Sequence, residues 1–184
     1  YQSRRFDGDA IPPILALEAE RRNGDLEVCR TIYCGSFSKT LSPGLRVGWV
    51  CAAMPVISQL VLMKQAADLH SATLNQIAVA SVAEQHFDSH IDTIRSAYRA
   101  RRDTMLEALQ AHMPDGVSWT KPEGGMFIWV TLPDTLDGAD LLKQSLESER
   151  VAFVPGHAFF ADGSGRNTLR LSYSTSTEGK IAEG

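Results

Sequence analysis

The chain has 184 residues, of which 43% are hydrophobic and 22% are charged, a composition typical of a globular protein. Its net charge of −4 gives no overall cationic field, which argues against a nucleic-acid-binding protein. The three cysteines show no CxxC spacing, so neither a disulfide framework nor a zinc site is indicated, and no apolar stretch is long enough to span a bilayer. We therefore expect a protein of the cytoplasm with no membrane partner.

Both ends of the sequence lack the usual signs of a complete chain. It begins at Tyr1 with no methionine and no signal peptide, and it stops at Gly184 soon after Ser176-Thr177-Glu178 indicates a helix start. We expect a piece of a longer polypeptide.

The first half of the chain is expected to be mainly helical, with two strands. Val47 begins a nearly continuous apolar run, which is typical of a strand buried on both faces. In chain order the predicted elements are a short helix that follows Pro12-Pro13 and runs to about Arg22, a strand over residues 28–33, a loop over residues 35–39, a strand over residues 47–53, a helix from Pro55 to about His70 and a helix over residues 77–87.

The pattern changes after a helix that we expect from about Asp92 to His112, with an apolar stripe along one side. Strands are predicted over residues 117–120, 126–132, 151–154 and 169–173, with a helix over residues 139–150 between them. Strand, strand, helix, strand, strand is an α+β pattern. The long helix therefore predicts a boundary between two units, residues 1–90 and 91–184.

Lys39 lies in the most informative segment, Ser36-Phe37-Ser38-Lys39-Thr40-Leu41-Ser42-Pro43-Gly44-Leu45-Arg46. One interpretation is a phosphate-binding P-loop, because Gly35 precedes the segment and Lys39-Thr40 resembles the end of that motif. A P-loop needs glycine directly before the lysine and a helix directly after it. Ser38 and Pro43-Gly44 stand in those places, so this interpretation fails.

Ser36 and Lys39 also match the Ser-x-x-Lys motif of penicillin-recognising enzymes. In those enzymes Ser-Asp-Asn and Lys-Thr-Gly elements complete the site, and neither is present in this sequence. A nucleophilic Ser36 that forms an acyl-enzyme is kept as a weak alternative.

A third interpretation, a Schiff-base lysine that holds an aldehyde cofactor, explains more of the segment. Cationic or apolar neighbours favour condensation of a lysine amine with a carbonyl. Ser36 and Ser38 can donate hydroxyl hydrogen bonds to a phosphate, and Arg46 can add a bidentate, charge-assisted pair. Gly44 and Gly48 allow close approach of the backbone.

The motif Ser-x-Ser-Lys-x-x-x-x-Gly-x-Arg-x-Gly-Trp, from Ser36 to Trp49, resembles the cofactor-lysine segment of fold-type I pyridoxal-phosphate aminotransferases of class I/II. The similarity covers essentially the whole chain. It points to the α-aminoadipate aminotransferase branch, which includes the aminotransferase-like domains of MocR-type regulators. The segments that carry it further are Lys64-Gln65-Ala66-Ala67-Asp68-Leu69-His70, Gly124-Gly125-Met126-Phe127-Ile128-Trp129, Val154-Pro155-Gly156-His157-Ala158-Phe159 and Asn167-Thr168-Leu169-Arg170-Leu171-Ser172-Tyr173-Ser174.

This resemblance implies an α/β fold that consists of the end of the large cofactor-binding domain with a connecting helix (residues 1–90) and a smaller α+β domain, incomplete at its C-terminus (residues 91–184). The chain would be a C-terminal portion of such an enzyme. The family's aspartate against the pyridine nitrogen would lie three residues before Tyr1. A cofactor ring without that carboxylate is a poorer electron acceptor, so we expect this piece to be inactive alone.

Residue by residue, the resemblance makes Lys39 the Schiff-base lysine and the catalytic base for proton transfer. Ser36, Ser38 and Arg46 would bind the phosphate of pyridoxal 5′-phosphate, and Tyr1 would bind its ring hydroxyl. Arg170, an arginine in an apolar strand, would pair with the substrate α-carboxylate; a structural ion pair is the alternative for such a buried arginine.

The implied activity is transfer of an amino group between an amino acid and a 2-oxo acid by a homodimeric, pyridoxal-phosphate-dependent enzyme. The alternative is an effector-sensing domain of a MocR/GntR-type transcription regulator, which would keep Lys39 and Arg46 without turnover. A winged-helix segment in the full-length chain would distinguish the two.

Three other signals receive structural interpretations. His86 and His90 lie four apart on a helix but lack the glutamate of a zinc helix, so we expect no metal site. The arginines from Arg95 to Arg102 are interpreted as a solvated helix face without a nucleic-acid contact. Trp119, Phe127 and Trp129 are interpreted as strand core.

Overall fold

The computed structural model describes residues 2–184, which form two compact units. Unit 1 contains the chain up to Arg4 together with Asp9–Thr93, and unit 2 contains Arg5–Gly8 together with Ile94–Gly184. No helix within residues 2–184 is both long enough and apolar enough to cross a membrane.

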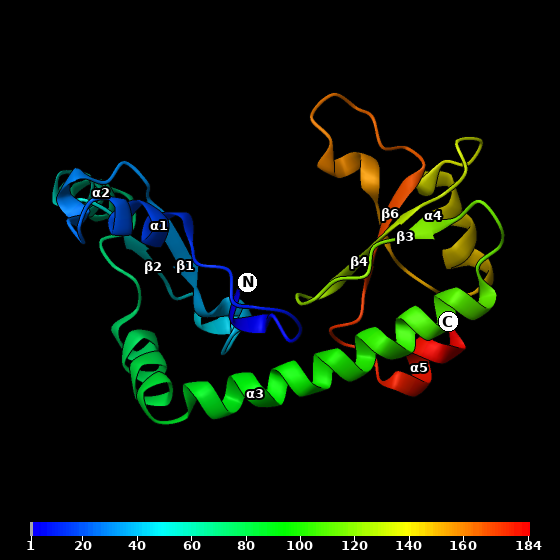
Figure 1. Ribbon diagram of the computed structural model, residues 1–184, viewed down its shortest axis with the longest axis horizontal. Coiled ribbons are helices and arrows are strands. Elements are labelled where there is room, and N and C mark those ends of the chain that lie inside the picture. Colours follow the sequence, from blue (N-terminus) through cyan, green and yellow to red (C-terminus); the bar gives the residue numbers. More distant parts are fainter. Residues whose placement is uncertain (1) are drawn as a thin grey trace. The chain divides into compact units, whose positions relative to one another are not determined.

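Unit 1 consists of helices around one antiparallel pair of strands, β1 and β2 (Figure 1). Pro13 precedes α1, and Asn23, with φ 55°, follows its C-terminal end, which agrees with the predicted helix. The described elements are the 3₁₀ turn η1 (Gln2–Arg4), α1 (Ile14–Arg21), η2 (Leu26–Val28), β1 (Tyr33–Ser36), η3 (Phe37–Lys39), η4 (Pro43–Leu45), β2 (Gly48–Cys51), α2 (Met54–Ala67) and the beginning of α3 (Thr73–His112).

The two strands of unit 1 differ from the sequence prediction. The first was expected over residues 28–33, but β1 begins at Tyr33 and continues into the predicted loop. The second was expected to be buried on both faces, yet Trp49 and Val50 are 40% and 41% exposed. Within residues 2–184, β2 pairs only with β1, with Tyr33 opposite Cys51 and Ser36 opposite Gly48. A two-stranded ribbon cannot cover both of its faces, which explains the exposure.

The two helices predicted over residues 77–87 and about 92–112 form one helix, α3. The intervening Asp88-Ser89-His90-Ile91 contains no proline or glycine to end it. The Ser89 and Thr93 hydroxyls donate to carbonyl oxygens of the preceding turn, at 3.1 and 3.0 Å, and so remain compatible with the helix. The division between the units falls inside this continuous helix.

Unit 2 contains a four-stranded antiparallel sheet of order β3-β4-β6-β5, in which β4 and β6 pair over five residues each. The strands predicted over residues 117–120, 126–132 and 169–173 are confirmed, but the one expected over residues 151–154 begins only at Val154 and ends at Pro155. Their bounds are β3 (Ser118–Trp119), β4 (Phe127–Thr131), β5 (Val154–Pro155) and β6 (Thr168–Ser172), and the helices are α4 (Gly138–Ser148), η5 (Gly156–Phe159) and α5 (Glu178–Glu183).

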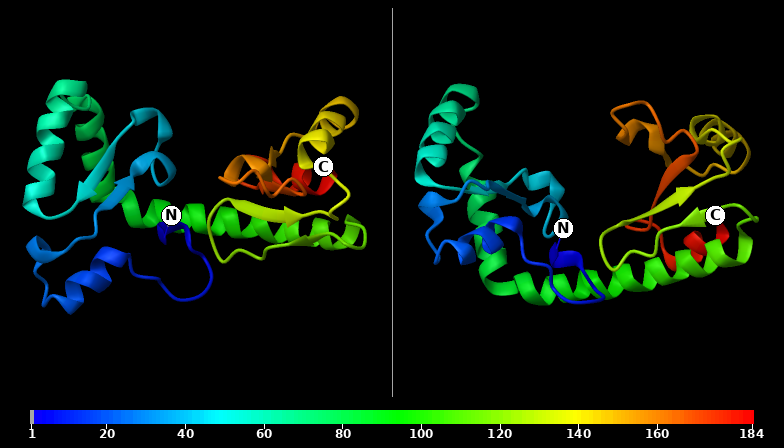
Figure 2. Two further views of the ribbon diagram at one scale, coloured as in Figure 1. Left: turned by 90° about the horizontal axis from the view of Figure 1, so that it is seen from above. Right: turned by 45° about the horizontal axis from the view of Figure 1, so that its top comes forward.

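The core of unit 2 lies on one face of this sheet. Ile128 and Val130, alternating residues of β4, are fully buried and cluster with Leu169 of β6. Leu109 of α3 and Ile181 of α5 complete the cluster, in agreement with the position of α5 beside the C-terminal part of α3 (Figure 2). Phe127 and Trp129, which were predicted to be core, alternate with these residues and so face the other side of the sheet, while Trp119 packs partly buried against the core.

The short segment Arg5–Gly8 belongs to unit 2, and ion pairs hold it against the C-terminal part of α3. Phe6 is buried, and the Asp7 carboxylate accepts from Arg102 at 2.5 Å and pairs with Arg99 at 3.2 Å. Arg102 is only 11% exposed, and Arg101 donates to the Ser174 carbonyl at 2.7 Å. The prediction of a solvated arginine face is therefore wrong for Arg102, because the segment that covers it is distant in sequence, whereas the Arg99 side chain is 50% exposed.

Candidate functional site

Lys39 ends a tight turn that begins where β1 ends. The Ser36 hydroxyl accepts a hydrogen bond from the Ser38 N–H at 3.1 Å, which caps the single turn η3, and donates to the Ser38 hydroxyl at 3.0 Å. Phe37 donates its N–H to the Val47 carbonyl at 3.1 Å and so joins the two ends of the loop. Lys39 is exposed, so its amine is accessible to a reactant.

Arg46 follows the second turn, η4, in a left-handed conformation with φ 53° and ψ 39°. Left-handed backbone is unfavourable for a residue with a Cβ, so the surrounding structure must hold it. The Arg46 Nη1 donates to the Pro43 carbonyl at 3.2 Å, which leaves its other N–H groups available. Two residues later, a Cβ at Gly48 would lie 3.0 Å from the Gly35 carbonyl oxygen, a tight contact that favours glycine at this position beside the turn.

Asn75 holds this turn from α3, and the sequence alone gave no reason to single it out. Its Nδ2 donates to the Leu45 carbonyl oxygen at 3.0 Å, in a partly buried bond that joins residues 30 apart. Leu45 directly precedes Arg46, so the bond restrains the backbone at the left-handed residue. No local sequence pattern could have indicated this role, because the acceptor is a main-chain carbonyl 30 residues away.

These groups have the chemistry that a phosphate-bearing aldehyde requires. The turn carries two hydroxyls, a guanidinium and an exposed amine, all within residues 36–46, and hydroxyl and guanidinium donors are the groups that bind phosphate. A lysine amine is the group that condenses with an aldehyde. The donor set thus fits pyridoxal 5′-phosphate. Tyr1, predicted to bind its ring hydroxyl, lies outside the described residues.

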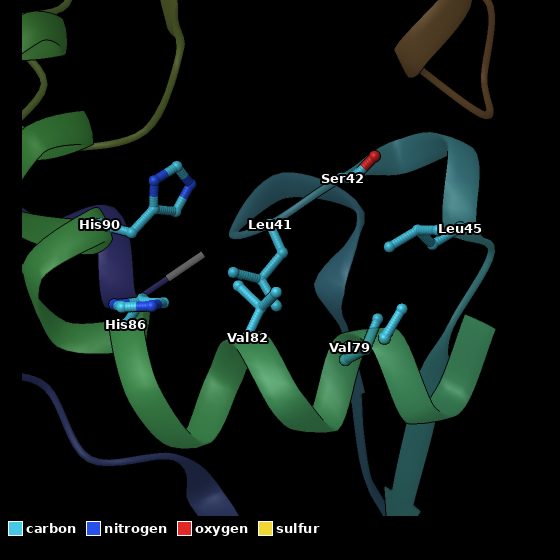
Figure 3. A pocket seen from close by; sticks show the side chains of 8 residues that line it. Leu41, Ser42, Leu45, Val79, Val82, His86 and His90 are labelled. Atoms are coloured by element: carbon cyan, nitrogen blue, oxygen red, sulfur yellow. The ribbon is translucent and has the colours of Figure 1, made fainter. Parts of the chain in front are cut away.

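A groove of about 260 Å³ adjoins the turn within unit 1 (Figure 3). Leu41 and Val82 point toward one another across it, and His86 and His90 lie at one end. Its lining residues are Leu41, Ser42, Leu45, Ala78, Val79, Val82, His86 and His90. In the described part of the chain the two histidines belong to no group of three metal-ligating side chains. The groove is mainly apolar and lies between the lysine turn and α3.

Arg170 lies in unit 2 on β6, opposite Trp129 of β4 and Val154 of β5. Its guanidinium carbon lies 4.0 Å from the centre of the Phe127 ring and 4.5 Å from that of Phe159. Within residues 2–184 no carboxylate is within 4.0 Å of the Arg170 side chain. The structural ion pair considered as the alternative is thus not found in this part of the molecule.

Comparisons with known proteins agree with these features. Residues 4–184 match the family described as aminotransferase class I and II. The chain is 43% identical over its whole length to aromatic-amino-acid aminotransferase 1 of Thermococcus litoralis, covering 42% of that protein. It is 48% identical over 83% of its length to 2-aminoadipate transaminase of Thermus thermophilus, covering 38% of that protein. Two HTH-type transcriptional regulators of Bacillus subtilis match at lower identity, 36% and 34%, over 83% and 90% of the chain.

Solved structures give the same assignment. The crystal structure of LysN, the α-aminoadipate aminotransferase of Thermus thermophilus complexed with N-(5′-phosphopyridoxyl)-L-leucine, has a TM-score of 0.91 and 43% identity. The match covers all of this chain and 46% of that one. The chain therefore spans less than half the length of the relatives that it matches, and the predicted α/β class is confirmed. The chain belongs to the class I and II aminotransferase family.

Proposed function

We propose that the protein containing this chain is a pyridoxal-phosphate-dependent aminotransferase that moves an amino group between an amino acid and a 2-oxo acid. The observation that carries the proposal is the turn from Ser36 to Arg46. It offers an exposed lysine amine, a hydrogen-bonded pair of serine hydroxyls and an arginine held in a left-handed conformation. Family membership supports it further, as does Arg170, whose side chain meets no carboxylate within residues 2–184.

Each residue has a role in this proposal. Ser36, Ser38 and Arg46 hold the phosphate through two hydroxyls and a guanidinium. Lys39 would bind the cofactor through its Nζ and, in the reaction, would move the proton from the substrate Cα to the carbon that was the cofactor's aldehyde carbon. Bound pyridoxal 5′-phosphate supplies a ring that accepts the electron pair left on that carbon.

Arg170 orients the substrate through its α-carboxylate. A guanidinium presents two parallel N–H donors to a carboxylate, which fixes both distance and plane. We also propose that Tyr1 donates to the ring hydroxyl of the cofactor, and that the enzyme acts in the cytoplasm as a homodimer; light scattering of the purified full-length protein tests the last point.

The test uses full-length protein loaded with pyridoxal 5′-phosphate and a panel of amino acids. An aminotransferase is expected to lose the absorbance of the bound cofactor when an amino donor is added, and to recover it when a 2-oxo acid is added. A protein that binds the cofactor and returns no amino group to any 2-oxo acid would contradict the proposal.

A second candidate is the ligand-sensing domain of a transcription regulator, which the similarity to HTH-type regulators favours. Such a domain would bind the cofactor and an amine without repeated turnover. The higher identity to the two aminotransferases supports the enzyme. The half-reaction described above distinguishes the candidates directly.

A further inference from the structure

The guanidinium of Arg170 is held by aromatic rings from two different elements. Phe127 belongs to β4 and Phe159 to η5, and both ring centres lie within 4.5 Å of the Arg170 guanidinium carbon. An aromatic ring attracts a cation placed over its face at this distance. Two such rings restrict the rotation of an otherwise flexible side chain.

Phe159 is 49% exposed, but contacts within unit 2 hold its ring and the turn that carries it. The Trp129 ring, opposite Arg170 in the sheet, lies edge to face with Phe159 at 5.5 Å between ring centres. Gly156 at the start of η5 is buried, and a Cβ there would come 1.8 Å from the Thr168 Oγ1 of β6. The turn that carries Phe159 therefore packs directly on the strand that carries Arg170.

This arrangement determines how an anion can reach the arginine. A ring stacked on a guanidinium removes water from its face and leaves the N–H groups directed outward in the plane. A carboxylate then pairs best edge to edge with that plane, as two parallel hydrogen bonds require.

We propose that Phe127 and Phe159 are positioning residues for Arg170, holding its guanidinium so that the N–H edge faces the substrate α-carboxylate. The proposal rests on the function proposed above and deepens it. The rings act through Arg170 and need not touch the reacting atoms.

The test compares an amino acid with the amine that has the same side chain and no carboxylate, for example phenylalanine and phenylethylamine. In the full-length holoenzyme, the rate of cofactor absorbance change is measured for each. Phe127→Leu and Phe159→Leu are expected to slow the amino acid by roughly 3- to 30-fold and to leave the amine nearly unchanged. Phe127→Tyr keeps an aromatic ring at this position and is expected to keep the wild-type preference for the amino acid over the amine.

A second readout does not depend on turnover. An unreactive carboxylate, such as an α-methyl amino acid, is titrated and its Kd is measured by calorimetry. The Kd is expected to rise by the same roughly 3- to 30-fold factor in the two leucine variants, and to rise at least as much in Arg170→Lys. Phe160→Leu is the matched control. The Phe160 ring lies against Trp129, whereas the rings over Arg170 are those of Phe127 and Phe159, so this variant should keep the wild-type Kd.

Each outcome decides the proposal. If the leucine variants keep the wild-type preference for the amino acid over the amine and the wild-type Kd for the carboxylate, while Arg170→Lys loses the preference and binds the carboxylate more weakly, the rings do not position the arginine. Equal losses for amino acid and amine would mean that the rings only support the fold, and would overturn the proposal as well. If wild-type protein transfers no amino group, the proposed function fails, and the Kd series then decides the positioning role alone.

Discussion

Asn75 and Leu45, thirty residues apart, are joined by a 3.0 Å hydrogen bond from the asparagine amide to the leucine carbonyl. The bond fastens the lysine turn to α3 directly before the left-handed Arg46. A left-handed conformation costs a residue with a Cβ about 1 kcal/mol, and one hydrogen bond contributes a similar amount. The bond is thus large enough to decide whether Arg46 keeps its conformation.

Replacement of this asparagine is the first prediction. Asn75→Ala is expected to lower the free energy of unfolding by about 1 kcal/mol and to weaken cofactor binding, because the Arg46 backbone gains freedom. Urea unfolding and titration with pyridoxal 5′-phosphate measure the two effects. Gln76→Ala, which removes only an exposed bond to the Ser71 carbonyl, is the control and should bind the cofactor normally.

Ser36 has a capping role and a proposed phosphate-binding role, and two substitutions separate them. Ser36→Ala removes the acceptor for the Ser38 N–H, so it should lower the unfolding free energy by about 1 kcal/mol and cofactor affinity by roughly tenfold. Ser36→Asp keeps an acceptor for that N–H but repels the phosphate. It should preserve the melting temperature and reduce cofactor affinity by at least roughly a hundredfold. Normal cofactor binding by Ser36→Asp would remove the serine from the phosphate site.

Glu18 of α1 should make stability depend on pH. Hydrogen bonds from the Thr31 side chain and from the Arg30 and Thr31 N–H groups lower the pKa of Glu18 from 4.5 to about 2. A lowered pKa in the folded state means that the carboxylate stabilises the fold fully above pH 4.5. This contribution is lost as the pH falls from 4.5 toward 2.

The corresponding experiment compares urea unfolding of wild type and Glu18→Gln across that range. The variant is expected to be less stable at pH 7 and to approach wild type near pH 2. Glu20→Gln, the same change at an exposed position of the same helix, is the control and should follow the wild-type curve. A Glu18→Gln deficit that stays constant with pH would argue against the charged carboxylate as its cause.

Asp7 should be the main attachment of its segment to unit 2. Asp7→Asn leaves the nearly buried Arg102 without one of its two carboxylates and weakens the contact with Arg99. We expect a loss of about 1–3 kcal/mol in unfolding free energy, as for other hydrogen bonds to charged groups. Asp9→Asn, at an exposed position two residues on, should change it little; equal losses in both variants would contradict this role.

The sequence predicts those features that a local pattern encodes. Lys39, Arg46 and Arg170 stand out because a charged residue in an unusual local setting indicates chemistry. The strands of unit 2 follow from alternating apolar residues, and Ile128 and Val130 are indeed core.

Features that depend on distant contacts could not be predicted in this way. Asn75 finds its acceptor across 30 residues, and Arg170 meets Phe127 and Phe159 only through the register of β4 with β6 and the return of η5. The join of two predicted helices into α3 and the exposure of β2 likewise depend on what surrounds each segment.

Borohydride reduction of the full-length protein loaded with pyridoxal 5′-phosphate tests most directly whether Lys39 holds the cofactor. The reduced protein is digested and its peptides are weighed by mass spectrometry. A phosphopyridoxyl group is expected on Lys39, and both the label and the visible cofactor absorbance should be lost in Lys39→Ala. A label on another lysine, or an unchanged absorbance in Lys39→Ala, would contradict this role for Lys39.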